Sequence, residues 1–165
     1  FIKNELAYNE TIQAIEQIIE IIKFLNPSVN ITFTVSPIRH IKDGIVENSV
    51  SKSRLISAIH EVITKHNEIG YFPSFEIMID ELRDYSYYKA DGIHPNHFAI
   101  DYIWEKFSDC YFEQSTKHII IEIKKLKAAM DHKLLFPESK KAKIFKAQLK
   151  EKIEQFKVKF PQIKI

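Results

Sequence analysis

Hydrophobic and polar positions in the first part of the chain follow patterns typical of helices and short strands in turn. Apolar residues at helical spacing predict a first helix, which Asn9 caps and Asn26-Pro27-Ser28 ends. Its apolar positions are Ile12, Ile15, Ile19, Ile22 and Leu25. The alternating, β-branched segment Ile31–Val35 predicts a strand that ends at the turn Ser36-Pro37.

The alternation of helix and strand continues to about residue 107. A second helix is predicted from about Ser51 to His66, and Gly70–Pro73 predicts a short strand that proline ends. A further helix follows Pro95. The predicted inner faces of these two helices carry Leu55, Ile59, Val62, Ala99, Ile100, Ile103, Trp104 and Phe107. This order predicts an α/β layer with a parallel sheet. Since two parallel strands are not stable alone, the chain is either a piece of a larger domain, which we favour, or completes its sheet with another chain.

The last third of the chain has a different pattern and charge. Two amphipathic helices are predicted, one before Phe136-Pro137 and one that Glu138 or Ser139 starts. Their apolar positions are Ile119, Ile120, Ile123, Leu126, Met130, Phe145, Leu149, Ile153 and Phe156. Residues 1–113 hold 10 Lys and Arg against 17 Asp and Glu, whereas residues 114–165 hold 14 Lys against 5 acidic residues. We therefore expect an α/β part over residues 1–113 and a basic helical hairpin over residues 114–165 that packs on it.

The rest of the composition excludes several classes of protein. The single cysteine, Cys110, excludes an internal disulfide framework, is predicted to be a small buried hydrophobe, and fits a cytoplasmic location. No apolar run is long enough to cross a bilayer. The sequence begins at Phe1 and not at Met, so we expect the natural N-terminus to lie upstream.

The strongest candidate for catalytic chemistry is Asp91-Gly-Ile-His94-Pro95, on the turn before a predicted helix. A hydroxyl nucleophile needs a base, and a histidine serves best when a carboxylate holds its other ring nitrogen. The alternative is a capped helix start with a surface histidine, in which Pro95 takes a first-turn position. His97 raises the question of zinc, but no third ligand is evident, so we expect no metal.

A second candidate cluster follows the first predicted strand. In open α/β sheets ligands bind beyond the carboxyl ends of the strands, which is where Ser36, Arg39 and His40 lie. Arg39 could hold an anionic or polar group, and the alternative is a loop with surface ion pairs. Ser36 is a poor candidate nucleophile because no Gly-x-Ser-x-Gly motif surrounds it.

Taken together, the motifs resemble those of the GSCFA family in order and spacing. The matching segments are Thr34–His40, Lys42–Gly44, Glu47-Asn48, Ser51-Lys52, Tyr71–Glu76, Asp80–Tyr85 and Asp91–Pro95. Residues His132–Pro137, Glu138-Ser139 and Phe160-Pro161 resemble the family's C-terminal helical extension.

The resemblance implies a fold and an activity. GSCFA proteins are similar to SGNH/GDSL hydrolases, so the chain would be part of a flavodoxin-like three-layer α/β/α sheet domain with a C-terminal helical hairpin. Asp91 and His94 match the catalytic Asp-x-x-His motif of that superfamily. The family's serine comes from a Gly-Ser-Cys-Phe-Ala segment, which these 165 residues lack.

The expected function is hydrolysis of an acyl ester, of a small molecule or a carbohydrate, by the intact protein and without a cofactor. Ser36, Arg39, His40 and Tyr85 are the residues expected to shape substrate binding. Two alternatives stay open. The chain could be a non-catalytic module whose lysine-rich tail binds an anionic partner, or the tail could mediate self-association. Nucleic-acid binding is not expected because the tail lacks arginine and clustered aromatic residues, and the sequence leaves the oligomeric state open.

Overall fold

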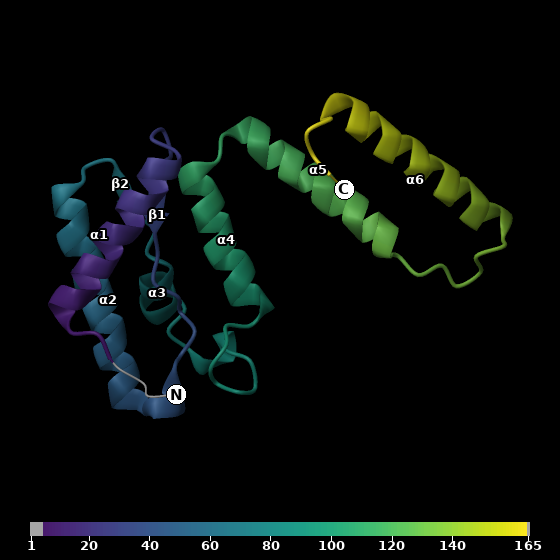
Figure 1. Ribbon diagram of the computed structural model, residues 1–165. Coiled ribbons are helices and arrows are strands. Elements are labelled where there is room, and N and C mark those ends of the chain that lie inside the picture. The colour runs from purple at the N-terminus through teal and green to yellow at the C-terminus, as the bar shows by residue number, and fades with distance from the viewer. Residues whose placement is uncertain (1–4, 165) are drawn as a thin grey trace. The chain divides into compact units, whose positions relative to one another are not determined.

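The protein is described by a computed structural model over residues 5–164, and the chain divides into two compact units at Phe107 and Ser108 (Figure 1). The first unit contains α1 (Tyr8–Leu25), β1 (Ile31–Phe33), η1 (Ile41–Asp43), α2 (Ile45–Lys65), β2 (Ile69–Tyr71), α3 (Ser74–Glu76), η2 (Ile77–Glu81) and η3 (Tyr85–Tyr87). Helix α4 (His97–Tyr111) crosses the division, and the second unit contains α5 (Gln114–Asp131) and α6 (Lys140–Lys159). The division lies a few residues before the change in charge near residue 113.

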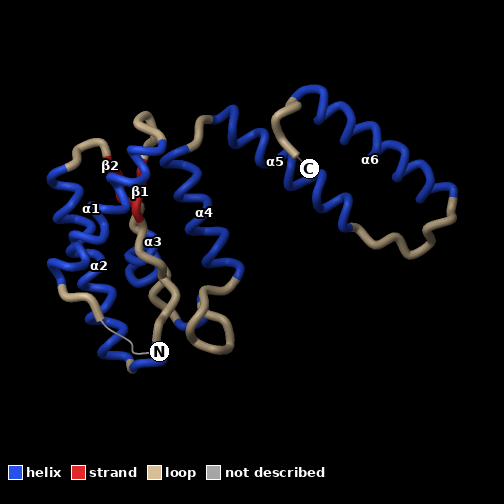
Figure 2. Tube along the Cα trace, in the orientation of Figure 1, coloured by secondary structure: helices blue, strands red, loops and turns tan. Residues whose placement is uncertain are grey.

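The strands β1 and β2 form a two-stranded parallel sheet, as the sequence predicts. Ile31 pairs with Ile69 and Phe33 with Tyr71. A hydrogen bond from the Phe72 N–H to the Phe33 carbonyl, 2.8 Å long, extends the pairing. Because α2 lies between the strands in sequence, the arrangement is a β–α–β crossover. Helices nevertheless dominate this mixed α/β protein (Figure 2), and the three-layer sandwich stays a prediction.

The main core of the first unit lies between the sheet, α1 and α2, which are packed side by side (Figure 1). Its buried members are Ile15, Ile19, Val35, Ala58, Ile59, Val62 and Ile69. Ile31 and Phe33 pack against this cluster, whereas Thr32, on the opposite face of β1, is exposed. A second cluster contains Met78, Leu82 and Ala99 and joins η2 to α4.

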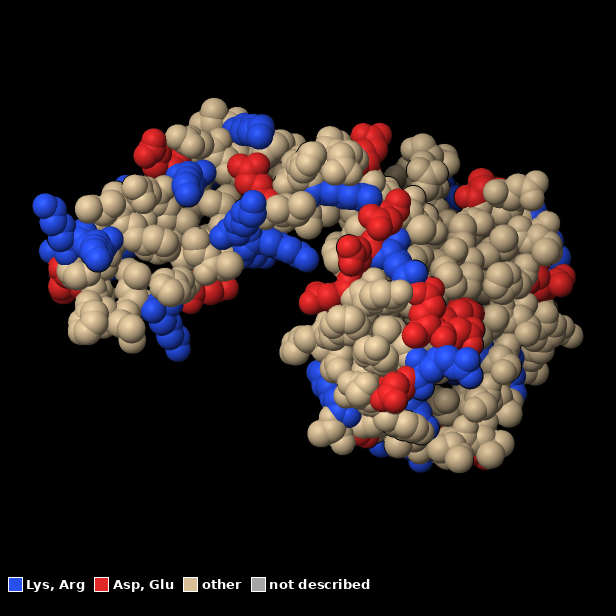
Figure 3. Space-filling view, turned by 180° about the vertical axis from the view of Figure 1, so that it is seen from behind, with Lys and Arg blue, Asp and Glu red and all other residues tan. Residues whose placement is uncertain are grey.

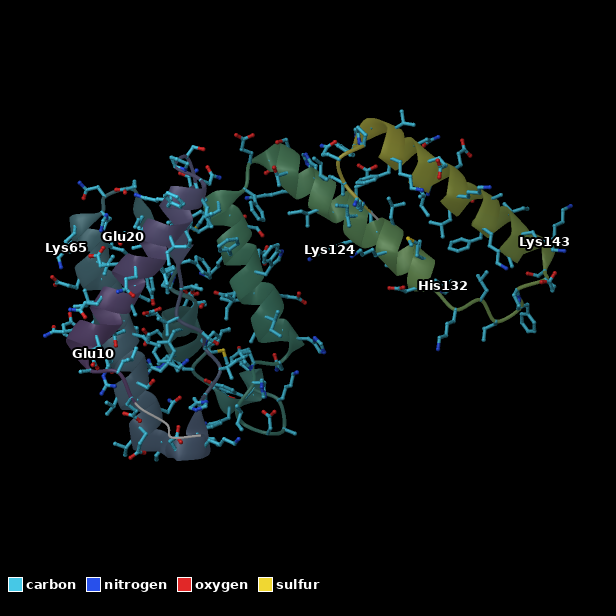
Figure 4. All side chains as sticks on the ribbon, viewed as in Figure 1. Glu10, Glu20, Lys65, Lys124, His132 and Lys143 are labelled. Atoms are coloured by element: carbon cyan, nitrogen blue, oxygen red, sulfur yellow. The ribbon has the colours of Figure 1, made fainter. Side chains whose placement is uncertain are left out.

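The predicted helix starts are wrong at both early helices. Helix α1 starts at Tyr8 with Ala7 as its cap, and the Glu10 carboxylate (Figure 4) accepts a 2.6 Å hydrogen bond from the Ala7 N–H. Asn9 therefore lies inside the helix and does not cap it. Helix α2 starts at Ile45, six residues before the predicted Ser51, directly after the turn at Gly44.

Several apolar residues predicted to face inward are exposed. In α2, Ile59 and Val62 are buried as predicted, but Leu55 is exposed. In α4, Ala99 is buried, but Ile100 and Trp104 are exposed. Helical periodicity identifies a stripe of apolar residues along each helix, and packing against the other described residues buries only part of that stripe.

The second unit is a hairpin of α5 and α6. Its core contains Leu126, Ala142 and Phe156, all buried. The Ser139 hydroxyl accepts a hydrogen bond from the Ala142 N–H and caps α6, which agrees with one of the two predicted starts. Met130, predicted to lie in the apolar seam, is exposed. His132 directly follows α5, and its ring contacts the ring of Phe145 in α6. Figure 4 labels His132 and Lys143, which lies near the start of α6.

Two further features bear on the predictions from composition. Among the described residues, no helix is long and apolar enough to span a membrane. Cys110 is exposed near the end of α4, so its prediction as a buried hydrophobe is wrong. The cysteine occupies a position of the helix that the described residues do not cover.

Candidate functional site

Asp91 and His94 form a hydrogen-bonded pair on the loop before α4. The Asp91 Oδ2 and His94 Nδ1 atoms lie 2.8 Å apart. The other carboxylate oxygen, Oδ1, accepts hydrogen bonds from the N–H groups of Ile93 at 2.8 Å and His94 at 3.0 Å. One carboxylate therefore fixes both the backbone of the turn and the imidazole ring.

The loop that carries the pair is held at both ends by backbone hydrogen bonds. The Lys89 N–H donates to the His94 carbonyl at 2.8 Å, and Tyr88 forms an antiparallel bridge with Pro95. The Asn96 side chain accepts from the Ala99 N–H at 3.0 Å and caps α4. The prediction of Pro95 in the first turn is thus wrong by two residues, because Pro95 belongs to the bridge and α4 begins at His97.

The protonation of the pair follows from the electrostatics of Asp91. Its hydrogen bonds from the backbone of His94 and Ile93, and then from the His94 ring, lower the pKa of the Asp91 carboxyl from 3.8 to about 2. At neutral pH the carboxylate is ionised and can only accept, so Nδ1 of His94 must donate. Neutral His94 then carries its lone pair on Nε2, for which residues 5–164 provide no hydrogen-bond partner. This is the tautomer that a general base requires.

Arg39 joins this loop to the segment that follows β1. Its backbone N–H donates to the Ile93 carbonyl, and its Nη1 donates to the Gly92 carbonyl, each over 3.2 Å. The guanidinium also lies over the rings of Tyr85 and Tyr88, at 5.8 and 6.0 Å from their centroids. These contacts bring Arg39, after β1, next to the loop of the Asp91–His94 pair.

A groove of about 690 Å³ lies next to this junction. Segments of residues 37–39, 45–53, 75–83 and 85–88 contribute to its walls. Arg39 and Tyr85 line it, whereas Asp91 and His94 do not. Arg39 therefore touches both the groove and the loop of the pair, and so does Tyr88, which lines the groove and bridges to Pro95.

Lys52 is a second cation of this groove. Its Nζ donates to the Ser36 carbonyl and lies 5.7 Å from the centroid of the Phe75 ring. Burial lowers the pKa of the Lys52 ammonium from its ordinary value of 10.5. The lysine has given up part of its hydration at this position.

The other predicted site residues have local partners. The Ser36 hydroxyl accepts from the Ile38 N–H at 3.2 Å. The His40 N–H donates to the Asn48 side chain, and the His40 ring lies 3.2 Å from Asp43. Neither Ser36 nor His40 lines the groove. The Asn48 side chain thus holds the turn at His40 and does not cap a helix.

His97 is exposed in the first turn of α4. Over the described part of the chain, no group of three or more His, Cys, Asp or Glu side chains is placed to hold a metal ion.

Sequence reasoning missed Lys52 and Arg83 as residues of the groove. Both line it, Lys52 from α2 and Arg83 from the segment after η2. The apolar spacing of Val46 and Val50, one helical turn apart, is a signal that α2 starts before Ser51, and it could have found the wall of the groove that precedes Lys52.

Gly92 provides the left-handed backbone that the loop needs, with a φ of 63°. Replacing it by alanine should lower the free energy of unfolding by about 1 kcal/mol, because an alanine is strained at positive φ. Its new Cβ would meet no described atom within 4 Å, so the cost is conformational. Urea unfolding of Gly92→Ala measures the loss. Gly92→Asn is the matched control, since asparagine tolerates this conformation, and an equal loss in both variants would contradict this explanation.

The titration of Asp91 provides a second prediction. In a ¹³C NMR titration its carboxyl should protonate with a midpoint of about 2 and not 3.8. Because the folded pKa is the lower one, the stabilising contribution is complete above pH 3.8 and is lost as the pH falls towards about 2. In His94→Ala the midpoint should rise but stay below 3.8, since the backbone hydrogen bonds remain. A midpoint at 3.8 in the unchanged protein would show that these bonds do not form.

Comparison with known proteins now adds the family. The GSCFA family is matched over residues 1–107. No curated protein and no solved structure matches the chain. The matched region ends at the division between the two units, so the resemblance of the C-terminal tail stays a prediction. Since the match covers well over half of the sequence and includes Asp91 and His94, the chain belongs to the GSCFA family.

Proposed function

We propose that this chain carries the general base of a serine hydrolase and that the full-length protein hydrolyses acyl esters. The observation that carries the proposal is the 2.8 Å contact between Asp91 Oδ2 and His94 Nδ1. The ionised carboxylate orients the ring and would stabilise the imidazolium that forms during turnover. Membership of a hydrolase-like family supports the same conclusion.

In the proposed mechanism the nucleophile is the serine of the family's Gly-Ser-Cys-Phe-Ala segment, which would lie upstream. Nε2 of His94 takes the proton of the serine hydroxyl while the serine oxygen attacks the acyl carbonyl. The alcohol leaves with that proton, and the acyl group stays on the serine. A water molecule then repeats the attack with His94 as base, which releases the acid and restores the serine.

The proposed fold around this site is the three-layer α/β/α sheet of SGNH hydrolases, with upstream strands completing the sheet. The parallel crossover from β1 through α2 to β2 is consistent with it. The substrate would be a small-molecule or carbohydrate O-acyl ester, and the location cytoplasmic. Arg39 and Tyr85 would contact the substrate directly, while Ser36 and His40 would shape the loop that holds Arg39.

Hydrolysis of p-nitrophenyl acetate and butyrate by the full-length protein tests the proposal. His94→Ala should lower kcat by about 10³-fold or more, in the range seen when a general base is removed. His97→Ala is the matched control, because His97 is an exposed histidine three residues away in sequence. Equal effects of the two substitutions, or no hydrolysis by the unchanged protein, would overturn the proposal.

The charge of the hairpin supports a second candidate function, binding to an anionic partner. Residues 114–165 hold 14 Lys and 5 acidic residues, and lysine side chains extend from this unit (Figure 3). Such binding should weaken steeply as the salt concentration rises. Binding of the full-length protein to heparin at 50 and 300 mM salt tests it, and affinity independent of salt would exclude an electrostatic partner.

A further inference from the structure

The groove beside the Asp91–His94 loop has an unusual distribution of charge. Of the described residues that line it, three are cations, Arg39, Lys52 and Arg83, and none is acidic. Residues 1–107 as a whole hold 10 Lys and Arg against 15 Asp and Glu. The groove is thus a positive site on a unit whose net charge is negative.

Among the described residues, no carboxylate forms an ion pair with these cations. Several acidic residues close to the lining in sequence have other partners: Asp43 lies 3.2 Å from His40, Glu76 accepts a 2.8 Å hydrogen bond from the Tyr71 hydroxyl, and Glu81 lies 2.7 Å from Lys106. Asp84 accepts a 2.7 Å hydrogen bond from the Ser86 N–H. Within residues 5–164, none of the three cations forms a salt bridge. Charge complementarity in the groove is therefore left to a ligand.

The remaining lining of the groove is largely apolar. Residues Ile45, Val46 and Val50 of α2 face it, together with Phe75 and Ile79. These α2 side chains are largely exposed to solvent. A volume of about 690 Å³ is within the range of small-molecule sites. The groove thus combines a cationic part with an apolar part of a size suited to a short alkyl chain.

We propose that this groove binds the anionic end of the substrate, a carboxylate or phosphate attached to a short apolar chain. Arg39, Lys52 and Arg83 bind the anion, and the apolar residues of α2 and η2 contact the chain. Arg39 also donates to Gly92 in the loop of the pair, so the anion and the reacting ester occupy neighbouring positions. The substrate class rests on the proposed ester hydrolysis, whereas binding of the anion requires no turnover.

Hexyl phosphate, hexanoate and the neutral hexanamide test this proposal by calorimetric titration. The titrations use the full-length protein with His94→Ala, so that no turnover interferes. Both anions should bind, and hexanamide should bind at least about tenfold more weakly, because charge-assisted hydrogen bonds are the strong ones. Tighter binding of hexyl phosphate than of hexanoate identifies a phosphate-bearing substrate, and the reverse order a carboxylate-bearing one; either order supports the site. Equal binding of the three probes, or binding of none, overturns the proposal.

Single variants locate the anion within the protein. Lys52→Met removes the charge but keeps an apolar stem near Phe75, and it should weaken hexyl phosphate binding about tenfold. Arg83→Gln, at an exposed position that does not risk the fold, should weaken it in the same direction. Lys42→Met is the matched control, an exposed lysine outside the lining. Unchanged affinity in both Lys52→Met and Arg83→Gln would overturn the site.

The two proposals fail in different ways. Anion binding without ester hydrolysis in the unchanged protein leaves the groove and removes the proposed function. Ester hydrolysis with no preference for the anions leaves the function and removes the groove as its anion site.

Discussion

Full-length protein carrying Asp91→Asn is expected to hydrolyse esters about 10³–10⁴ times more slowly than the unchanged protein. The asparagine oxygen can accept the same hydrogen bonds from the Ile93 and His94 backbone, so the turn is retained. Its amide nitrogen would face Nδ1 of His94 as a donor. His94 would then carry its proton on Nε2, the wrong tautomer for taking a proton from serine.

Measurements of kcat and of thermal unfolding together test this prediction. The loss should appear in kcat, with the melting temperature changed little. Asp84→Asn is the matched control, because Asp84 accepts a backbone hydrogen bond in a similar turn but has no histidine partner among the described residues. A loss of activity that merely followed a loss of folded protein, or an equal loss in Asp84→Asn, would contradict the assigned role.

Phe156→Ala is expected to have the largest effect on stability, about 3–5 kcal/mol, in the hairpin of α5 and α6. Phe156 is the most buried of the large side chains of this unit, at 1% exposure, and it packs against Phe160 with ring centroids 5.0 Å apart. Truncation would leave a cavity in the core of this unit, in which the other buried apolar side chains among the described residues are Leu126 and Ala142.

Hydrogen exchange of the α5 and α6 amides measures this loss directly. Val158→Ala is the matched control, because Val158 is 83% exposed on the same helix and its truncation should change stability by less than about 0.5 kcal/mol. Retained amide protection in Phe156→Ala would show that the hairpin is not held together by this core.

The sequence alone predicts the helices and strands better than it predicts which of their apolar residues are buried. Periodicity locates the buried Ile59 and Val62 and the short parallel strands, because these patterns are local. It also predicts inward positions for Leu55 and Ile100, which the structure exposes. Which apolar stripe is covered depends on the packing of distant segments, and periodicity carries no information about that.

The candidate site is also predictable only in part. The Asp91–His94 pair is predictable because the two residues are only three positions apart on one turn. The groove is not, since Arg39, Lys52 and Arg83 come from three separate segments that meet only in the folded unit. Because the predicted second helix begins only at about Ser51, the prediction leaves out the first turn of α2, which forms one wall of the groove.

Labelling with a fluorophosphonate probe, which reacts with an activated serine, tests the central claim most directly. Three proteins are compared: this 165-residue chain, the full-length protein, and the full-length protein with His94→Ala. We predict labelling of the unchanged full-length protein alone, because the proposed nucleophile would be an upstream serine whose activation would depend on His94. Absence of labelling in the full-length protein, or labelling that survives His94→Ala, would contradict the assignment of the general base to this chain.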